Sequence, residues 1–251
     1  MDATPAGTPS TPVLNLTADL PGPSPVHAYP RQSMERAYPL TKSRSKQIKI
    51  GLDVAKFTPF ILLQGDKKKN MFARPSIPIT PEEFEVLVSD EIHNHILTAL
   101  DSQTPIAPLL IGDLTLSLIM HQTNPNFRSV VFERKEFSVK ICLGASSWSM
   151  LNTAKHIMVD RLIKIHHICN VASLNLPSLL DHVKQTLADK GFKSVQAVKN
   201  LPFRKLEQLM RESLELFPSA FFPEVLKKEL IYFHSDIIIE KLFASWKSNN
   251  V

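Results

Sequence analysis

Positive charge is concentrated in one part of this 251-residue chain. Between residues 42 and 74, only Asp53 and Asp66 oppose a group of nine lysines and arginines. The nine are Lys42, Arg44, Lys46, Lys49, Lys56, Lys67, Lys68, Lys69 and Arg74. Lysine and arginine side chains displace counterions from a phosphate backbone, so this pattern predicts binding to a polyanion.

A second group of basic residues, further along the chain, extends the predicted contact set. The predicted nucleic-acid contacts are Lys46, Lys49, Lys56, Lys67, Lys68, Lys69, Arg74, Arg128, Arg134, Lys135 and Lys140. Aromatic side chains of the same region could stack on unpaired bases. They are Phe57, Phe60, Phe72, Phe127, Phe132 and Phe137. A phenylalanine in a strand more often belongs to the core, so the prediction depends mainly on the basic residues.

Other chemistry finds no support in the sequence. There is no G-x-x-x-x-G-K-[ST] phosphate loop, no G-x-S-x-G turn and no H-E-x-x-H zinc motif. His156 with Asp160, and the pair His166-His167 near Cys169, lack a second spaced pair of metal ligands. We therefore expect a protein that is not an enzyme and that uses no cofactor or metal.

The elements that must position these residues follow from the hydrophobic pattern. Apolar and polar residues alternate over residues 48–54, 114–118, 128–134 and 137–143, which predicts strands. The shorter segments 60–63, 71–74 and 77–79 are further predicted strands. Thr80, Pro81 and Glu83 form the sequence of a capping box and predict a helix to about residue 100. Another helix is predicted from Ser146 or Ser147 to about residue 165.

The same order of elements occurs twice, at a shift of 64 residues. The matching pairs are Ile77 with Ile141, Ile79 with Leu143, Phe84 with Trp148, and Leu87 with Leu151. Each pair agrees in residue type and in position within its unit, which favours a divergent duplication of a ββββα unit. Chance similarity between two αβ segments is the alternative.

The two ends of the chain differ from the middle. Residues 1–45 are expected to be a disordered Pro-rich tail, closed by the basic cluster Lys42–Lys46. That cluster suits a nuclear import signal, a polyanion-binding arm or a solvated linker. Helices are predicted from Asn175-Pro177 to Gly191, over 195–198, over 206–216 and from Pro223 onward.

These predictions combine into an α+β fold of two ββββα-type units, with antiparallel sheets and covering helices, followed by an all-helical C-terminal region. The expected domains are 1–45, 46–168 and 170–251. At 43% hydrophobic and 21% charged residues, the chain can bury a core. Two cysteines exclude a disulfide scaffold, and no apolar run approaches the length of a membrane span. We expect a soluble intracellular protein, nuclear or cytoplasmic rather than secreted.

The segment Ile77–Leu87, and less closely Ile141–Leu151, resembles the strand-to-helix element of the positive-cofactor-four transcriptional coactivators and their whirly relatives. The resemblance covers about residues 46–165. It implies a basic β-surface that binds single-stranded DNA, with two units paired into one platform. Pro75 and Pro78 shorten the third strand of the first copy and depart from the family pattern.

The leading functional hypothesis is a sequence-tolerant binder of single-stranded DNA or RNA in genome replication, transcription or packaging. The Pro-rich tail and diverged repeat would suit a viral protein. One alternative is a structural or adaptor protein that forms homo-oligomers or binds a protein partner through residues 170–251. Another is an RNA-binding, nucleocapsid-like protein. Residues 187–206 resemble the short helices of SAM-like and helix-hairpin-helix domains but lack the hairpin Gly-x-Gly, which favours a protein-interaction or packing role.

Overall fold

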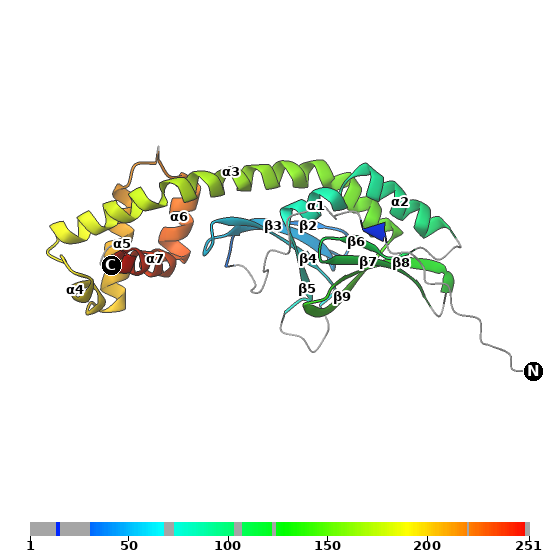
Figure 1. Cartoon of the computed structure of the whole chain (residues 1–251), viewed down its shortest axis with the longest axis horizontal. Coiled ribbons are helices and arrows are strands. Elements are labelled where there is room, and N and C mark those ends of the chain that lie inside the picture. The colour runs from blue at the N-terminus through cyan, green and yellow to red at the C-terminus, as the bar shows by residue number, and fades with distance from the viewer. Residues whose placement is uncertain are drawn as a thin grey trace, which may run out of the picture. The chain divides into compact units, whose positions relative to one another are not determined.

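The computed structural model describes residues 14–15, 31–67, 73–102, 107–121, 124–219 and 221–248. The fold is α+β, with two mainly antiparallel sheets, each followed by helices, and a helical C-terminal region (Figure 1). The predicted fold class is therefore confirmed. Of the tail expected over residues 1–45, most of the part before residue 31 lies outside the described residues.

Four strands form the first sheet in sequence order. They are β2 (Gln32–Pro39), β3 (Gln47–Asp53), β4 (Thr58–Gln64) and β5 (Ser76–Ile79). The prediction of a disordered tail is wrong for residues 32–39, which form β2. The sequence does not signal this strand, because it buries only Ser33 and Tyr38 and shows no clear alternation of apolar and polar residues. The strand expected over 71–74 falls partly outside the described residues, and Ala73 and Arg74 are irregular.

The second sheet contains β6 (Leu109–Ile111), β7 (Leu114–His121), β8 (Asn124–Arg134) and β9 (Phe137–Gly144), paired antiparallel in that order. A two-residue strand, β1 (Leu14–Asn15), pairs parallel with β6. Leu116, Phe132 and Ile141 are direct neighbours across β7, β8 and β9, and all three are buried. They define the inner face of this sheet.

Helices α1 (Pro81–Leu87) and α2 (Asp90–Asp101) follow β5. The Thr80 hydroxyl accepts from the Glu83 amide, and the Glu83 carboxylate accepts from the Thr80 amide, which confirms the capping box. The single helix expected over 80–100 is wrong, because the Ser89 side chain accepts from the Ile92 amide and starts a second helix. The two helices lie over the second sheet (Figure 1).

The eight positions matched by the 64-residue shift are all buried. They are Ile77, Ile79, Phe84, Leu87, Ile141, Leu143, Trp148 and Leu151. In each copy the last strand of a sheet leads into a helix whose first turns bury an aromatic residue and a leucine. The duplication remains a hypothesis, but the paired positions share one structural role.

Helix α3 (Ala145–Asp189) is one continuous helix of 45 residues. The separate helix expected from Asn175-Pro177 is wrong, because the chain stays helical through Pro177 and Leu179 and Val183 are fully buried beyond it. The Asn175 side chain instead donates to the Val171 carbonyl within the same helix. Gly191, at φ +91°, ends the helix as predicted.

The remaining helices are α4 (Val195–Lys199), α5 (Phe203–Leu216), α6 (Glu224–Phe233) and α7 (Ser235–Ser248). The single helix expected from Pro223 is interrupted at His234, whose ψ of 29° at φ −140° leaves the helical conformation. Leu226, Leu230 and Ile237 are buried core residues, whereas Phe233 is exposed.

The chain forms two compact units. Unit 1 comprises residues 1–27, 37–49 and 61–159, and unit 2 comprises residues 28–36, 50–60 and 160–251. The division falls between Val159 and Asp160 inside α3, whereas a boundary near residue 169 was expected. In unit 2, Leu52 on β3 and Val54 just after it share one core with the C-terminal half of α3 and with α5, α6 and α7.

In the described part of the chain, no helix combines the length and apolar character needed to cross a membrane.

Candidate nucleic-acid interface

Five of the basic residues between 42 and 74 gather at one end of the first sheet, in unit 1. We call this group the basic corner; its members are Lys42, Arg44, Lys46, Lys67 and Arg74. The β2–β3 turn contributes the first three, and the β4–β5 connection contributes the other two. The corner therefore depends on what holds these two segments together.

Hydroxyl and backbone bonds fix the β2–β3 turn. The Leu40 amide donates to the Lys46 carbonyl at 2.8 Å, which closes the turn. The Thr41 hydroxyl accepts from the amides of Ser45, at 3.0 Å, and Lys46, at 3.3 Å. Arg44 adopts φ +55°, a conformation that is uncommon for a residue other than glycine. The Arg44 side chain is exposed to solvent.

Arg74 joins the β4–β5 connection to this turn. Its guanidinium donates to the carbonyls of Arg44, at 2.9 Å, and Ser45, at 3.0 Å. Lys46 adds an ion pair to Asp66 at 3.5 Å. The two segments are thus bonded to each other, and they present the exposed side chains of Lys42, Arg44 and Lys67 in one place.

The electrostatics of the corner favour an anion. Within the described residues, Asp66 is the one acidic side chain that an ion pair joins to the corner. Arg74 is bonded to neutral carbonyls, so its positive charge is not cancelled. Several uncancelled positive charges close together raise the local concentration of a polyanion.

The other residues predicted between 42 and 74 fall outside this group. Lys49 is half-buried on β3. Lys56 is exposed between β3 and β4 but belongs to unit 2. Lys68 and Lys69 lie outside the described residues.

The prediction is wrong for Arg134, the member of the second group that the sheet buries most deeply. Its side chain is 1% exposed and pairs with Glu83 at 2.8 Å. The same guanidinium donates to the Pro78 carbonyl at 3.1 Å. Because its inner-face position on β8 aims it at α1, Arg134 stabilises the fold and cannot reach a bound strand.

The remaining second-group residues do not form a basic surface either. Arg128 donates to the Ala99 carbonyl at 3.2 Å and so holds the end of α2. Lys140 is exposed but pairs with Glu133 at 2.8 Å on the neighbouring strand. Lys135 is exposed at the β8–β9 turn. The described part of the second sheet therefore does not repeat the basic character of the first sheet.

Most of the predicted stacking residues are part of the core. Phe57, Phe60 and Phe132 are buried. Phe137 is half-buried, Phe127 is 51% exposed, and Phe72 lies outside the described residues. The three buried rings therefore belong to the core, as was noted above for phenylalanines in strands; Phe60 and Phe132 lie in strands and Phe57 lies in the turn before β4.

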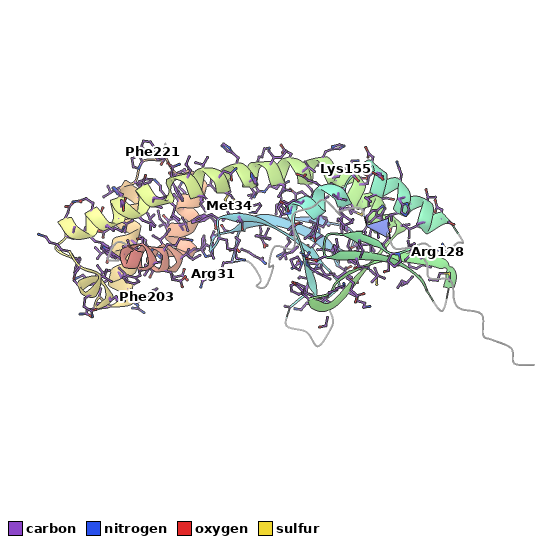
Figure 2. All side chains as sticks on the ribbon, viewed as in Figure 1. Arg31, Met34, Arg128, Lys155, Phe203 and Phe221 are labelled. Carbon is purple, nitrogen blue, oxygen red and sulfur yellow. The ribbon has the colours of Figure 1, made fainter. Side chains whose placement is uncertain are left out.

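A cavity of about 750 Å³ opens on the surface of unit 2. Its wall on α3 carries Arg161, Lys164 and His167, and its other walls, from β2 and α6, carry Glu35 and Glu229. The apolar lining comes from Met34, Ile163, Ile168 and Val225. Figure 2 labels Met34 in this unit. Arg161 donates to the Met34 carbonyl, which joins α3 to β2.

The described residues contain no cluster of metal-binding side chains. Across the ranges that the structure describes, no group of three or more histidine, cysteine or acidic side chains comes together. Cys169 is buried in the core of unit 2, and burial raises the pKa of its thiol to about 12. That thiol is therefore a core group rather than a nucleophile or metal ligand.

In comparisons with known proteins, the chain matches no family model, no curated protein and no solved structure. The functional argument accordingly depends on the geometry described above.

Sequence reasoning missed two basic features, only one of which the sequence signals. The bonds from Arg74 to the β2–β3 turn connect residues 29 and 30 positions apart, and no local pattern signals them. A further basic segment, residues 190–206, is visible in the sequence because it contains no acidic residue. Its significance depends on exposure, which only the structure supplies.

Proposed function

We propose that this chain is a non-enzymatic protein that binds single-stranded nucleic acid through the basic corner. The observation that supports this most directly is the bonded arrangement in which Arg74 fixes a turn carrying exposed Lys42 and Arg44 beside exposed Lys67. A turn whose backbone is already ordered loses little backbone freedom when its charges meet phosphates. Binding through backbone charge is tolerant of sequence.

We propose single strands as the ligand because the two successive ββββα segments resemble the DNA-binding units of the positive-cofactor-four and whirly proteins. Such a protein would act in replication, transcription or packaging of a genome. A nucleocapsid-like protein would use the same chemistry on RNA. DNA and RNA are therefore separate arms of the experiment.

The test is a fluorescence-polarisation titration of the full chain with labelled 30-mers of single-stranded DNA, single-stranded RNA and duplex DNA, at several salt concentrations. The variant Lys42→Glu/Arg44→Glu removes two exposed charges of the basic corner. We expect it to bind single strands about tenfold or more weakly. Its log–log salt slope should fall by about 1.4, for two lost phosphate contacts at about 0.7 each.

The matched control is Lys135→Glu/Lys140→Glu, which alters net charge equally within unit 1 but on the second sheet. Its affinity should fall much less. Equal losses of affinity in the two variants would show that binding depends only on net charge, and would overturn the proposed site. Tighter binding to duplex than to single strands would overturn the proposed substrate.

The cavity of unit 2 favours a second candidate function, self-association. Exposed apolar side chains line it, with Ile163 63% and Val225 57% exposed. Its α3 wall carries Arg161, bonded to a neutral carbonyl, and Lys164, paired with Asp160, and it faces walls that carry Glu35 and Glu229. When two copies meet about a twofold axis, the basic wall of each can meet the acidic wall of the other, so the surface is complementary to itself. A second copy of this chain is the occupant that we propose.

Light scattering after size-exclusion chromatography tests this second function. Ile163→Glu or Val225→Glu should convert a dimer into a monomer without unfolding it, since both side chains are exposed. Leu216→Glu is the control, because Leu216 is 69% exposed on α5 but does not line the cavity. If the wild-type chain is still a monomer at about 100 micromolar, a concentration on the order of the dissociation constant of a weak dimer, the proposed dimer is excluded.

A further inference from the structure

The helical unit carries a second basic surface, far from the basic corner in sequence. Residues 190–206 contain five basic residues and no acidic residue. Besides Lys190, four basic side chains of the segment are exposed: Lys193, Lys199, Arg204 and Lys205. With Phe203 they form what we call the α4–α5 surface. Lys190 is excluded, because it pairs with Glu212.

Local structure holds this surface in place. Gly191 ends α3 in a left-handed conformation, and the Phe192 amide donates to the Leu187 carbonyl at 2.9 Å. The Ser194 hydroxyl then accepts from the Ala197 amide and starts α4. Two tight connections, between α3 and α4 and between α4 and α5, thus fix where the basic side chains leave the backbone.

Aromatic rings, rather than carboxylates, support two of the lysines. The Lys205 ammonium lies 5.8 Å from the centre of the Phe192 ring, and the Lys199 ammonium lies 5.7 Å from that of Phe243. A ring orients an ammonium group without cancelling its charge. The positive charge of the surface therefore remains available to an anion.

Phe203 distinguishes this surface from an ordinary solvated face. Phe203, labelled in Figure 2, is 59% exposed. Arg204 and Lys205 follow it directly in the sequence. Exposed aromatics among cations are the combination that single-stranded nucleic acids use, because an unpaired base stacks on the ring while the cations meet the phosphates. Bases inside a duplex are already stacked and cannot use the ring.

We infer that the α4–α5 surface is a second contact for single-stranded nucleic acid, with Phe203 as the stacking residue. The inference rests on the proposed function for its class of ligand but not on the basic corner. It changes the role expected for residues 187–206, which the sequence assigned to packing or protein interaction. An acidic protein or an anionic membrane would be attracted by the charges but would not need an unpaired base.

The test uses the full chain and the same polarisation titration, with single-stranded and duplex 30-mers. Phe203→Ala should weaken binding to the single strand about 5- to 150-fold, the range for one lost base stack, and should leave duplex binding unchanged. Phe203→Trp should retain affinity, and its fluorescence should change when single-stranded DNA is added. Lys193→Gln/Arg204→Gln should lower the salt slope by about 1.4.

The matched control is Lys184→Gln/Lys228→Gln, two lysines of the same unit that are paired with Asp181 and Glu224. Its slope should be unchanged. Wild-type affinity in Phe203→Ala, or an equal loss for duplex and single strand, would overturn the inference. So would binding to anionic vesicles but not to oligonucleotides. If Phe203→Ala weakens binding while Lys42→Glu/Arg44→Glu does not, the basic corner is overturned as a binding site and the α4–α5 surface is supported.

Discussion

Arg134 and Glu83 form a buried ion pair between the two ββββα segments. The Arg134 guanidinium donates to the Glu83 carboxylate at 2.8 Å, and the two side chains are 1% and 4% exposed. The carboxylate also accepts from the amides of Thr80, at 2.8 Å, and Asp113, at 3.1 Å. One carboxylate thus caps α1 of the first ββββα segment and binds the β6–β7 turn and β8 of the second.

Glu83→Gln should destabilise unit 1 by about 3–5 kcal/mol, because it leaves a buried guanidinium without its main counter-charge. Chemical denaturation with urea measures the loss. Glu85→Gln, an exposed position on the same helix, is the control and should change stability by less than about 0.5 kcal/mol. In a double-mutant cycle, Glu83→Gln combined with Arg134→Met should cost less than the sum of the two single changes. Additive losses of stability would show that Glu83 and Arg134 do not interact directly.

Gly112 is the next test of this network. It adopts φ +59°, and a Cβ atom there would lie 2.7 Å from the Glu83 carboxylate. Gly112→Ala should therefore lower the free energy of unfolding by about 1–3 kcal/mol. Gly144→Ala is the matched control, since its Cβ atom would only touch Phe127 at 3.4 Å. Similar stability of the two variants would show that the turn is not constrained.

This network also shows where sequence reasoning ends. The Thr80 capping box and the stop at Gly191 were predictable, because each depends on residues within a few positions. The burial of Arg134 was not, because it depends on a partner 51 positions away. A basic residue beside a strand looks the same in sequence whether it faces solvent or an opposing carboxylate.

The helices show the same limit. Pro177 predicts a break, yet packing of apolar residues on both sides keeps α3 continuous. Ser89 and His234 interrupt helices whose apolar periodicity runs on across them. For the candidate interface, sequence identified the basic corner residues, but their grouping follows from the long-range bonds of Arg74.

His93 should make the stability of unit 1 depend on pH. Its ring stacks on Trp148 with centroids 6.2 Å apart, and burial, followed by the nearby Lys155 charge, lowers its pKa. The folded state then holds a neutral ring that the unfolded chain protonates near pH 6.5. Stability should be complete above pH 6.5 and fall as the pH drops below it.

Thermal unfolding of the wild type and of His93→Gln at pH 7.5 and pH 5.5 measures this effect, and the variant should lose less stability on acidification. NMR titration should place the His93 pKa below 6.5. A pKa above 6.5 would reverse the sign of the effect. Asp90, whose pKa is lowered by its bond to Lys155, acts in a separate window below about pH 3.8.

The two thiols should differ sharply in reactivity. Cys169 is 2% exposed and its pKa is raised to about 12 by burial, whereas Cys142 is half-buried on β9. At pH 8, a thiol-specific chromogenic reagent should modify one cysteine quickly and the second only after denaturant is added. Cys142→Ser should abolish the fast phase. A fast phase that survives this change would mean that unit 2 opens readily.

The interleaving of the two units limits how this protein can be divided. The chain passes between them along β2, β3, β4 and α3, so no single cut releases either one whole. Truncation near residue 169 would strip the helices from Leu52, Val54 and Phe57 and leave these apolar side chains facing water. Such fragments should aggregate when expressed. Neither unit could be transferred to another protein as one continuous segment. Dissection of this protein accordingly calls for point substitutions in the full-length chain.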